Sequence, residues 1–78
     1  MPRYFFNLYN DVTALDEEGV ELPDLAAAEA HGICETRTMA AVSVKEGHID
    51  FNHRIDIADE HGAVLRTIRF ADAIAVRR

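Results

Sequence analysis

Apolar and aromatic residues dominate the first stretch of the chain, RYFFNLY at residues 3–9, and their types predict a strand. Side chains of a strand point alternately to its two faces. Here both faces of the strand are largely apolar. One face carries Tyr4, Phe6 and Leu8, and the other carries Phe5, Asn7 and Tyr9. This pattern predicts a central strand. Asn10 and Asp11 are a favourable turn pair, after which residues 12–15 can return as a short antiparallel strand.

The longest periodic segment predicts one helix over about residues 24–45. Small and apolar side chains at three- and four-residue spacing define its expected buried face: Ala26, Ala30, Ile33, Ala40, Ala41 and Val44. Such side chains let a helix lie close on a sheet, and Gly32 would allow the closest contact. Asp24 is expected at the N-cap or in the first turn, and Gly47 is expected to end the helix.

A second hairpin is predicted over residues 54–70. The segment RIDIA alternates polar and apolar positions, and the following DEHG has the Asp and Gly that a type I turn favours at its ends. In the returning strand, Val64, Ile68 and Phe70 are expected on one face of the sheet and Leu65 on the other.

These elements follow one another as β-β-α-β-β, with sequential hairpins around one helix. The order predicts an α+β fold of two layers, in which one long helix packs on one face of an antiparallel sheet of three to four strands. The 78 residues are short enough that we expect a single domain, residues 1–78.

The balance of charge limits the classes of partner. The chain has 14 acidic and 8 basic residues and a net charge of −6, which argues against a nucleic-acid partner, because phosphate binding needs clustered Lys and Arg. No apolar run approaches the ~20 residues of a membrane span. The N-terminal residues lack the features of a signal peptide, and the one cysteine fits a reducing compartment. We therefore expect a cytoplasmic protein that binds no membrane.

The stretch DEEGVELPD at residues 16–24 is rich in carboxylates. A calcium loop needs oxygen ligands at alternating positions and a glycine at its sixth position, and this spacing does not provide them. Asp16, Glu17 and Glu18 are adjacent, so their side chains need not converge. We expect a solvated turn followed by the start of the helix, and no metal site.

His31 and Cys34 lie three residues apart and would share a helical face. Zinc needs further ligands, and the chain has no complementary C-x-x-C or H-x-x-x-H motif. A catalytic cysteine would need an orienting group and an oxyanion hole within a pocket, which so small a domain rarely encloses. The four glycines are isolated, so no phosphate loop is present. We predict no catalytic residues, no cofactor and no metal, and hence not an enzyme.

Arginines alternate with aromatic residues in the predicted strands, as in some RNA-binding sheets. No RNP-type motif accompanies them, and the net charge is of the wrong sign. We therefore expect Arg54, Arg66 and Arg69 to pair across strands with Asp56 and neighbouring acids.

Three segments carry a resemblance to a known family: PRYFF at the start, DEEGVELPDLAAAEA in the middle, and IDIADEHGAVLRTIRFADAI near the end. Together they resemble a family of short, uncharacterised bacterial proteins, frequent in proteobacteria and described as a domain of unknown function. The resemblance covers nearly the whole chain, and its middle motif is the most specific. It implies a compact domain, without an activity or a set of catalytic residues.

The apolar pattern leads to a functional expectation. A single helix covers one face of a sheet, so large apolar groups remain on the other, and such patches mark interfaces. We predict a non-catalytic module that binds proteins, works as a homodimer and uses Phe5, Tyr9 and Leu65 at the interface. The C-terminal turn at residues 70–74 could instead cover this face. A second hypothesis is an acidic inhibitor or regulator that mimics nucleic acid.

Overall fold

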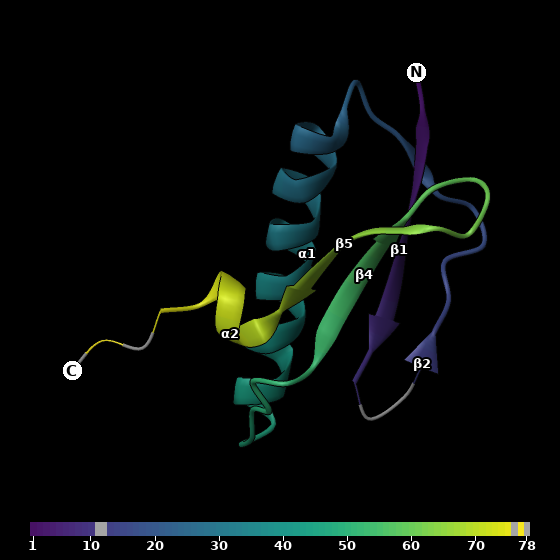
Figure 1. Ribbon diagram of the computed structural model, residues 1–78. Coiled ribbons are helices and arrows are strands. Elements are labelled where there is room, and N and C mark those ends of the chain that lie inside the picture. The colour runs from purple at the N-terminus through teal and green to yellow at the C-terminus, as the bar shows by residue number, and fades with distance from the viewer. Residues whose placement is uncertain (11–12, 76, 78) are drawn as a thin grey trace.

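The chain runs through three strands, a long helix, two strands and a short helix (Figure 1). The structure is a computed structural model that describes residues 1–10, 13–75 and 77. Its elements are β1 (Arg3–Tyr9), β2 (Thr13–Ala14), β3 (Val20–Glu21), α1 (Leu25–Lys45), β4 (Arg54–Ala58), β5 (Val64–Arg69) and α2 (Phe70–Ala73). The α+β class, the antiparallel sheet and the single long helix confirm the fold predicted from the sequence.

The sheet has five strands, one more than the largest number expected. Its order is β2-β1-β4-β5, all antiparallel, and β3 pairs with the start of β1 through Arg3–Glu21 and Tyr4–Val20. The additional strand arises because Gly19, at a φ of 71°, turns the chain back toward β1. Of the predicted strand at residues 12–15, Thr13 and Ala14 form β2, while residue 12 lies outside the described residues.

Helix α1 lies close to the sheet through a stripe of small residues that agrees only in part with the predicted face: Ala40 is buried and Ile33 packs against the core, as expected. The buried residues are spaced four apart: Ala28, Gly32, Thr36 and Ala40. The predicted Ala26, Ala30, Ala41 and Val44 are exposed instead. Alanine occurs on several sides of this helix, so apolarity alone does not mark the face that is buried. Thr36 is fully buried, and its hydroxyl is satisfied there because Oγ1 donates a hydrogen bond to the Gly32 carbonyl at 2.7 Å.

Gly32 confirms the predicted close contact. A Cβ atom there would lie 2.7 Å from Ile68 Cδ1 and 3.2 Å from Ile57 Cδ1, closer than packed carbon atoms normally approach. The core therefore lies between α1 and the facing side of β4 and β5. Its largest fully buried side chains are Phe70, Ile57 and Thr36.

A β-bulge changes the predicted faces of the second hairpin. The register shifts between Ile57 and Ala58, so that Ala58 is opposite Val64 and Leu65 is the additional residue. Val64 is consequently 56% exposed, whereas Leu65 packs against the core. The prediction that Val64 shares a face with Ile68, with Leu65 on the opposite face, is therefore wrong.

The C-terminal turn does not cover the second face of the sheet. Helix α2 packs beside α1 and β5, on the same side as α1 (Figure 1). Arg37 Nε donates to the Ala73 carbonyl at 2.9 Å and holds the two helices together. The alternative placement of residues 70–74 is thus wrong. Within the described residues, no helix is both long and apolar enough to cross a membrane.

Candidate functional site

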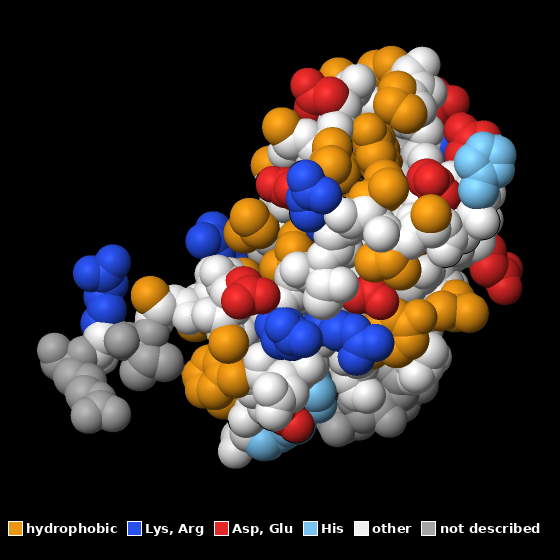
Figure 2. All heavy atoms as spheres, viewed as in Figure 1, with side chains coloured by type: hydrophobic (Ala, Val, Ile, Leu, Met, Phe, Trp, Pro, Cys, Tyr) orange, Lys and Arg blue, Asp and Glu red, His pale blue; other side chains and the backbone are white. Residues whose placement is uncertain are grey.

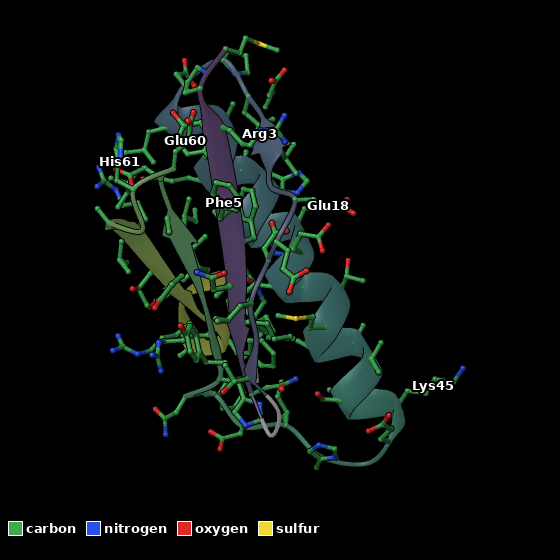
Figure 3. The ribbon with its side chains drawn as sticks, turned by 90° about the vertical axis from the view of Figure 1, so that its right-hand side faces the viewer. Arg3, Phe5, Glu18, Lys45, Glu60 and His61 are labelled. Carbon is green, nitrogen blue, oxygen red and sulfur yellow. The ribbon has the colours of Figure 1, made fainter. Side chains whose placement is uncertain are left out.

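Neither helix covers the sheet face opposite α1, although Leu15, Asp16 and Gly19 lie beside Phe5 and Asn7 at its β1 side. Three strands supply the side chains of this face. We call this surface the open face; it comprises Phe5, Asn7 and Tyr9 of β1, Arg54, Asp56 and Ala58 of β4, and Val64, Thr67 and Arg69 of β5. The strand register aligns these residues in three rows across the sheet. Figure 3 shows the two layers from the side, with α1 on one side of the sheet and the open face on the other.

The first row of the open face is apolar and consists of Phe5, Ala58 and Val64. Phe5 is half-buried, while Val64 is more than half exposed. A shallow hollow of about 250 Å³ lies at this end, bounded by Phe5, Ala58 and Glu60 among others. Glu60 and His61 of the β4–β5 hairpin lie on the same side of the sheet as this hollow (Figure 3).

The middle row is polar and satisfied within the chain. Asp56 is only 7% exposed, and its Oδ1 accepts from Thr67 Oγ1 at 2.8 Å and from Arg54 Nε at 3.4 Å. Asn7 completes this row beside Asp56 and accepts from the Asp16 backbone N–H at 3.0 Å. Because each of these side chains has a hydrogen-bond partner within the chain, the middle row offers few unsatisfied groups.

The third row is basic and aromatic, formed by Tyr9, Arg54 and Arg69. The Arg54 guanidinium lies 4.3 Å from the centre of the Tyr9 ring, a cation–π contact. Figure 2 shows basic side chains side by side on this surface, with hydrophobic side chains next to them. Arg69 has no carboxylate within salt-bridge distance among the described residues.

The predicted pairing of the three arginines with acids across strands is wrong. Arg54 does pair with Asp56, but within the same strand. Arg66 pairs with Glu29 of α1 at 2.6 Å instead of with an acid across the sheet, because it points toward the helix. Arg69 remains available at the end of the open face.

Asp16 joins the middle of β1 to the acidic stretch. Its carboxylate accepts from the backbone N–H of Phe6 at 3.1 Å, of Glu18 at 3.1 Å and of Gly19 at 3.0 Å. Burial by itself raises the pKa of Asp16, but the hydrogen bonds from Gly19, Phe6 and Glu18, together with Arg3, outweigh burial and place the pKa below its ordinary value of 3.8. No pattern in the sequence indicates this role, since Asp16 resembles the other carboxylates of the acidic stretch.

The rest of the acidic stretch also supports the backbone. The Asp24 carboxylate accepts from the Ala27 N–H at 2.8 Å, which confirms Asp24 as the N-cap of α1. Arg3 donates to the Glu18 carbonyl at 2.7 Å and to Glu21 at 3.1 Å. Among the described residues, no three His, Cys, Asp or Glu side chains gather closely enough to hold a metal ion.

A groove of about 390 Å³ separates α1 from the β1 edge of the sheet. His31 lines it, with its ring 4.7 Å from that of Phe6 and its Nε2 3.9 Å from Glu35 Oε1. Cys34 is exposed and is not among the lining residues, so the structure does not bring His31 and Cys34 together in a pocket. Among the described residues, no Ser, Thr, Cys or Lys side chain lines this groove.

The sequence also identifies the family. A family model for a domain of unknown function, DUF6894, matches residues 3–71. The chain belongs to this family. No curated protein and no solved structure matches the chain. The match confirms the resemblance noted from the sequence, and it includes every residue of the open face.

Proposed function

We propose that this member of the DUF6894 family is a non-catalytic module that binds another protein through the open face. The observation that supports the proposal most is that both helices lie on the same side of the sheet. The opposite side keeps Phe5, Tyr9 and Val64 in contact with solvent. Aromatic side chains and arginine are the residue types that carry most binding energy at protein interfaces.

The groove beneath α1 gives less support to an enzyme. His31 and Glu35 could move a proton, but the Asp16 carboxylate that also lines the groove accepts three backbone hydrogen bonds and supports the fold. The proposed function therefore assigns no catalytic residues to this chain.

The acidic-mimic hypothesis also receives less support from the placement of the carboxylates. A mimic of a phosphate backbone needs acidic groups in rows on one face. Glu21, Glu29 and Asp56 lie on different elements, and each pairs with an arginine. In Figure 2 the acidic side chains are separated from one another. This spread favours the interaction module.

Site-specific photo-crosslinking tests the proposal in cells that make the protein. One variant carries the crosslinking residue in place of Val64 on the open face, and the control carries it in place of Val44 on α1. The two valines have matched exposure, 56% and 58%. We expect protein adducts from position 64 and few from position 44. Equal yields, or adducts from position 44 alone, would contradict an interface on the open face.

A further inference from the structure

The two ends of the open face carry opposite charge. Arg54 and Arg69 lie at the end where the Tyr9 row crosses the sheet. Glu60, in the hairpin between β4 and β5, lies at the other end beside the Phe5 row. Neither Arg69 nor Glu60 forms an ion pair with another described residue. The face therefore has one cationic and one anionic end, and among the described residues no ion pair neutralises Arg69 at the first or Glu60 at the second.

The apolar features of the face are also divided between its ends. The hollow of about 250 Å³ lies at the anionic end, beside Phe5 and Ala58. The half-buried Tyr9 ring lies at the cationic end, next to Arg54. A partner that suits this surface presents an aromatic group and a cation to one end, and a carboxylate to the other.

The open face of a second copy meets that description when its strands run antiparallel to those of the first copy. We propose that two copies of the chain pack open face against open face, with their strands antiparallel, around a two-fold axis through the middle row. This inference rests on the proposed function and names its partner as a second copy. Glu60 of each copy then faces Arg69 of the other, and Tyr9 of each copy lies over the hollow beside Phe5 of the other. Such a contact is the same for both copies and closes a dimer.

The residues at the axis do not oppose this arrangement. Asp56 of both copies lies near the axis, but the residue is only 7% exposed and its carboxylate bonds Arg54 and Thr67 in its own chain. The exposed Thr67 hydroxyl stands beside it in the middle row. The axis is therefore lined by satisfied polar groups, as opposed to two free charges of the same sign.

The outer edge of β5 is a weaker site for a second copy. An edge strand recruits a partner through its unpaired backbone groups, and charged side chains and bulges discourage such pairing. β5 has both features, since it carries the exposed Arg66 and Arg69 and contains the bulge at Leu65. Packing through the open face leaves this edge in solvent.

The size of the face sets the strength of the dimer. Three strands and three rows span about 15 by 20 Å at ordinary strand spacing and rise. Such an area is below that of a standard interface and is typical of weak, transient complexes. We expect a dissociation constant in the micromolar range, increasing with salt because the two ends attract by charge.

Charge reversal with rescue tests the arrangement. Sedimentation velocity is recorded across micromolar concentrations for the native chain, Glu60→Arg, Arg69→Glu and the double variant. The native mass should rise from 8.7 kDa toward twice that value. Each single reversal places like charges together at two symmetric sites and should raise the dissociation constant about tenfold or more. The double variant restores opposite charges and should return close to the native value.

Two exposed residues at the end of α1 supply matched controls. Lys45→Glu and Glu46→Arg change the net charge by the same amounts at residues outside the open face, and Figure 3 shows Lys45 at the far end of α1. Both variants should leave the dissociation constant unchanged. Single reversals that behave like these controls, or a double variant that stays weak, would overturn the arrangement. A native chain that stays at 8.7 kDa while position 64 still crosslinks to other proteins would overturn only the dimer. The absence of adducts at position 64 would overturn the proposed function as well.

Discussion

Replacing Asp16 removes a carboxylate that accepts a backbone hydrogen bond from the middle of β1, on the edge that faces away from β4. On this edge, β2 pairs with Leu8 and Tyr9, while β3 pairs with Arg3 and Tyr4. The Phe6 N–H lies between these two short ladders and donates to the Asp16 carboxylate at 3.1 Å. The Asp16→Ala variant leaves this part-buried donor without its acceptor.

The magnitude follows from the three hydrogen bonds that Asp16 accepts. An unsatisfied buried donor costs about 1–3 kcal/mol, and the Phe6 N–H is the donor least able to turn to water. The Glu18 and Gly19 N–H groups lie in a turn near solvent, where water replaces much of the lost interaction. We expect Asp16→Ala to lower the free energy of unfolding by about 2–3 kcal/mol in total. In a domain of this size the midpoint of thermal unfolding should fall by about 10–20 °C.

Urea unfolding at pH 7 measures the loss, with the exposed neighbour Glu17→Ala as the control. Asp16→Asn keeps one acceptor oxygen and should show an intermediate loss. Because the folded pKa of Asp16 lies below 3.8, the stability from its charge is present above pH 3.8 and disappears as the pH falls through the folded pKa. The difference in the free energy of unfolding between the native chain and Asp16→Asn should therefore become smaller below pH 3.8. Equal stability of Asp16→Ala and Glu17→Ala, or a gap that widens in acid, would refute this reasoning.

Three further substitutions test other contacts in the fold. Asp24→Ala should lower the free energy of unfolding by about 0.5–2 kcal/mol in urea titrations, because the Ala27 N–H loses its cap; no loss would contradict the N-cap assignment. Gly32→Val should cost about 1–3 kcal/mol by calorimetry, because its Cβ meets Ile68, and a stabilised variant would count against the close packing. The exposed Cys34 should react fully with a thiol reagent in the folded state, and Cys34→Ser should change stability by less than about 0.5 kcal/mol; a protected thiol would place it in the core.

The sequence predicts the elements whose patterns are long and strong. The aromatic run at residues 3–9, the helix beginning after Asp24 and the hairpin with its DEHG turn all lie where expected. Each has many residues that agree on one period, so a local exception does not change the prediction. Phe5 and Tyr9 fall on the open face because the period of two in β1 is uninterrupted.

The predictions fail where a single residue or a side chain decides the structure. One additional residue in the bulge exchanges the faces of Val64 and Leu65, and no pattern in the sequence marks the shift. β3 has two residues inside an acidic stretch, too few to show alternation. The role of Asp16 depends on backbone groups far along the chain, so its neighbours in sequence do not indicate it.

Nuclear magnetic resonance during dilution tests most directly whether the open face is the contact surface. Amide spectra of the labelled chain are recorded from millimolar to low micromolar concentration. We predict concentration-dependent shifts at Phe5, Tyr9, Glu60, Val64 and Arg69, with little change along the outer side of α1. Shifts centred on α1 or the groove beneath it, or spectra that do not change at all, would contradict self-association through the open face.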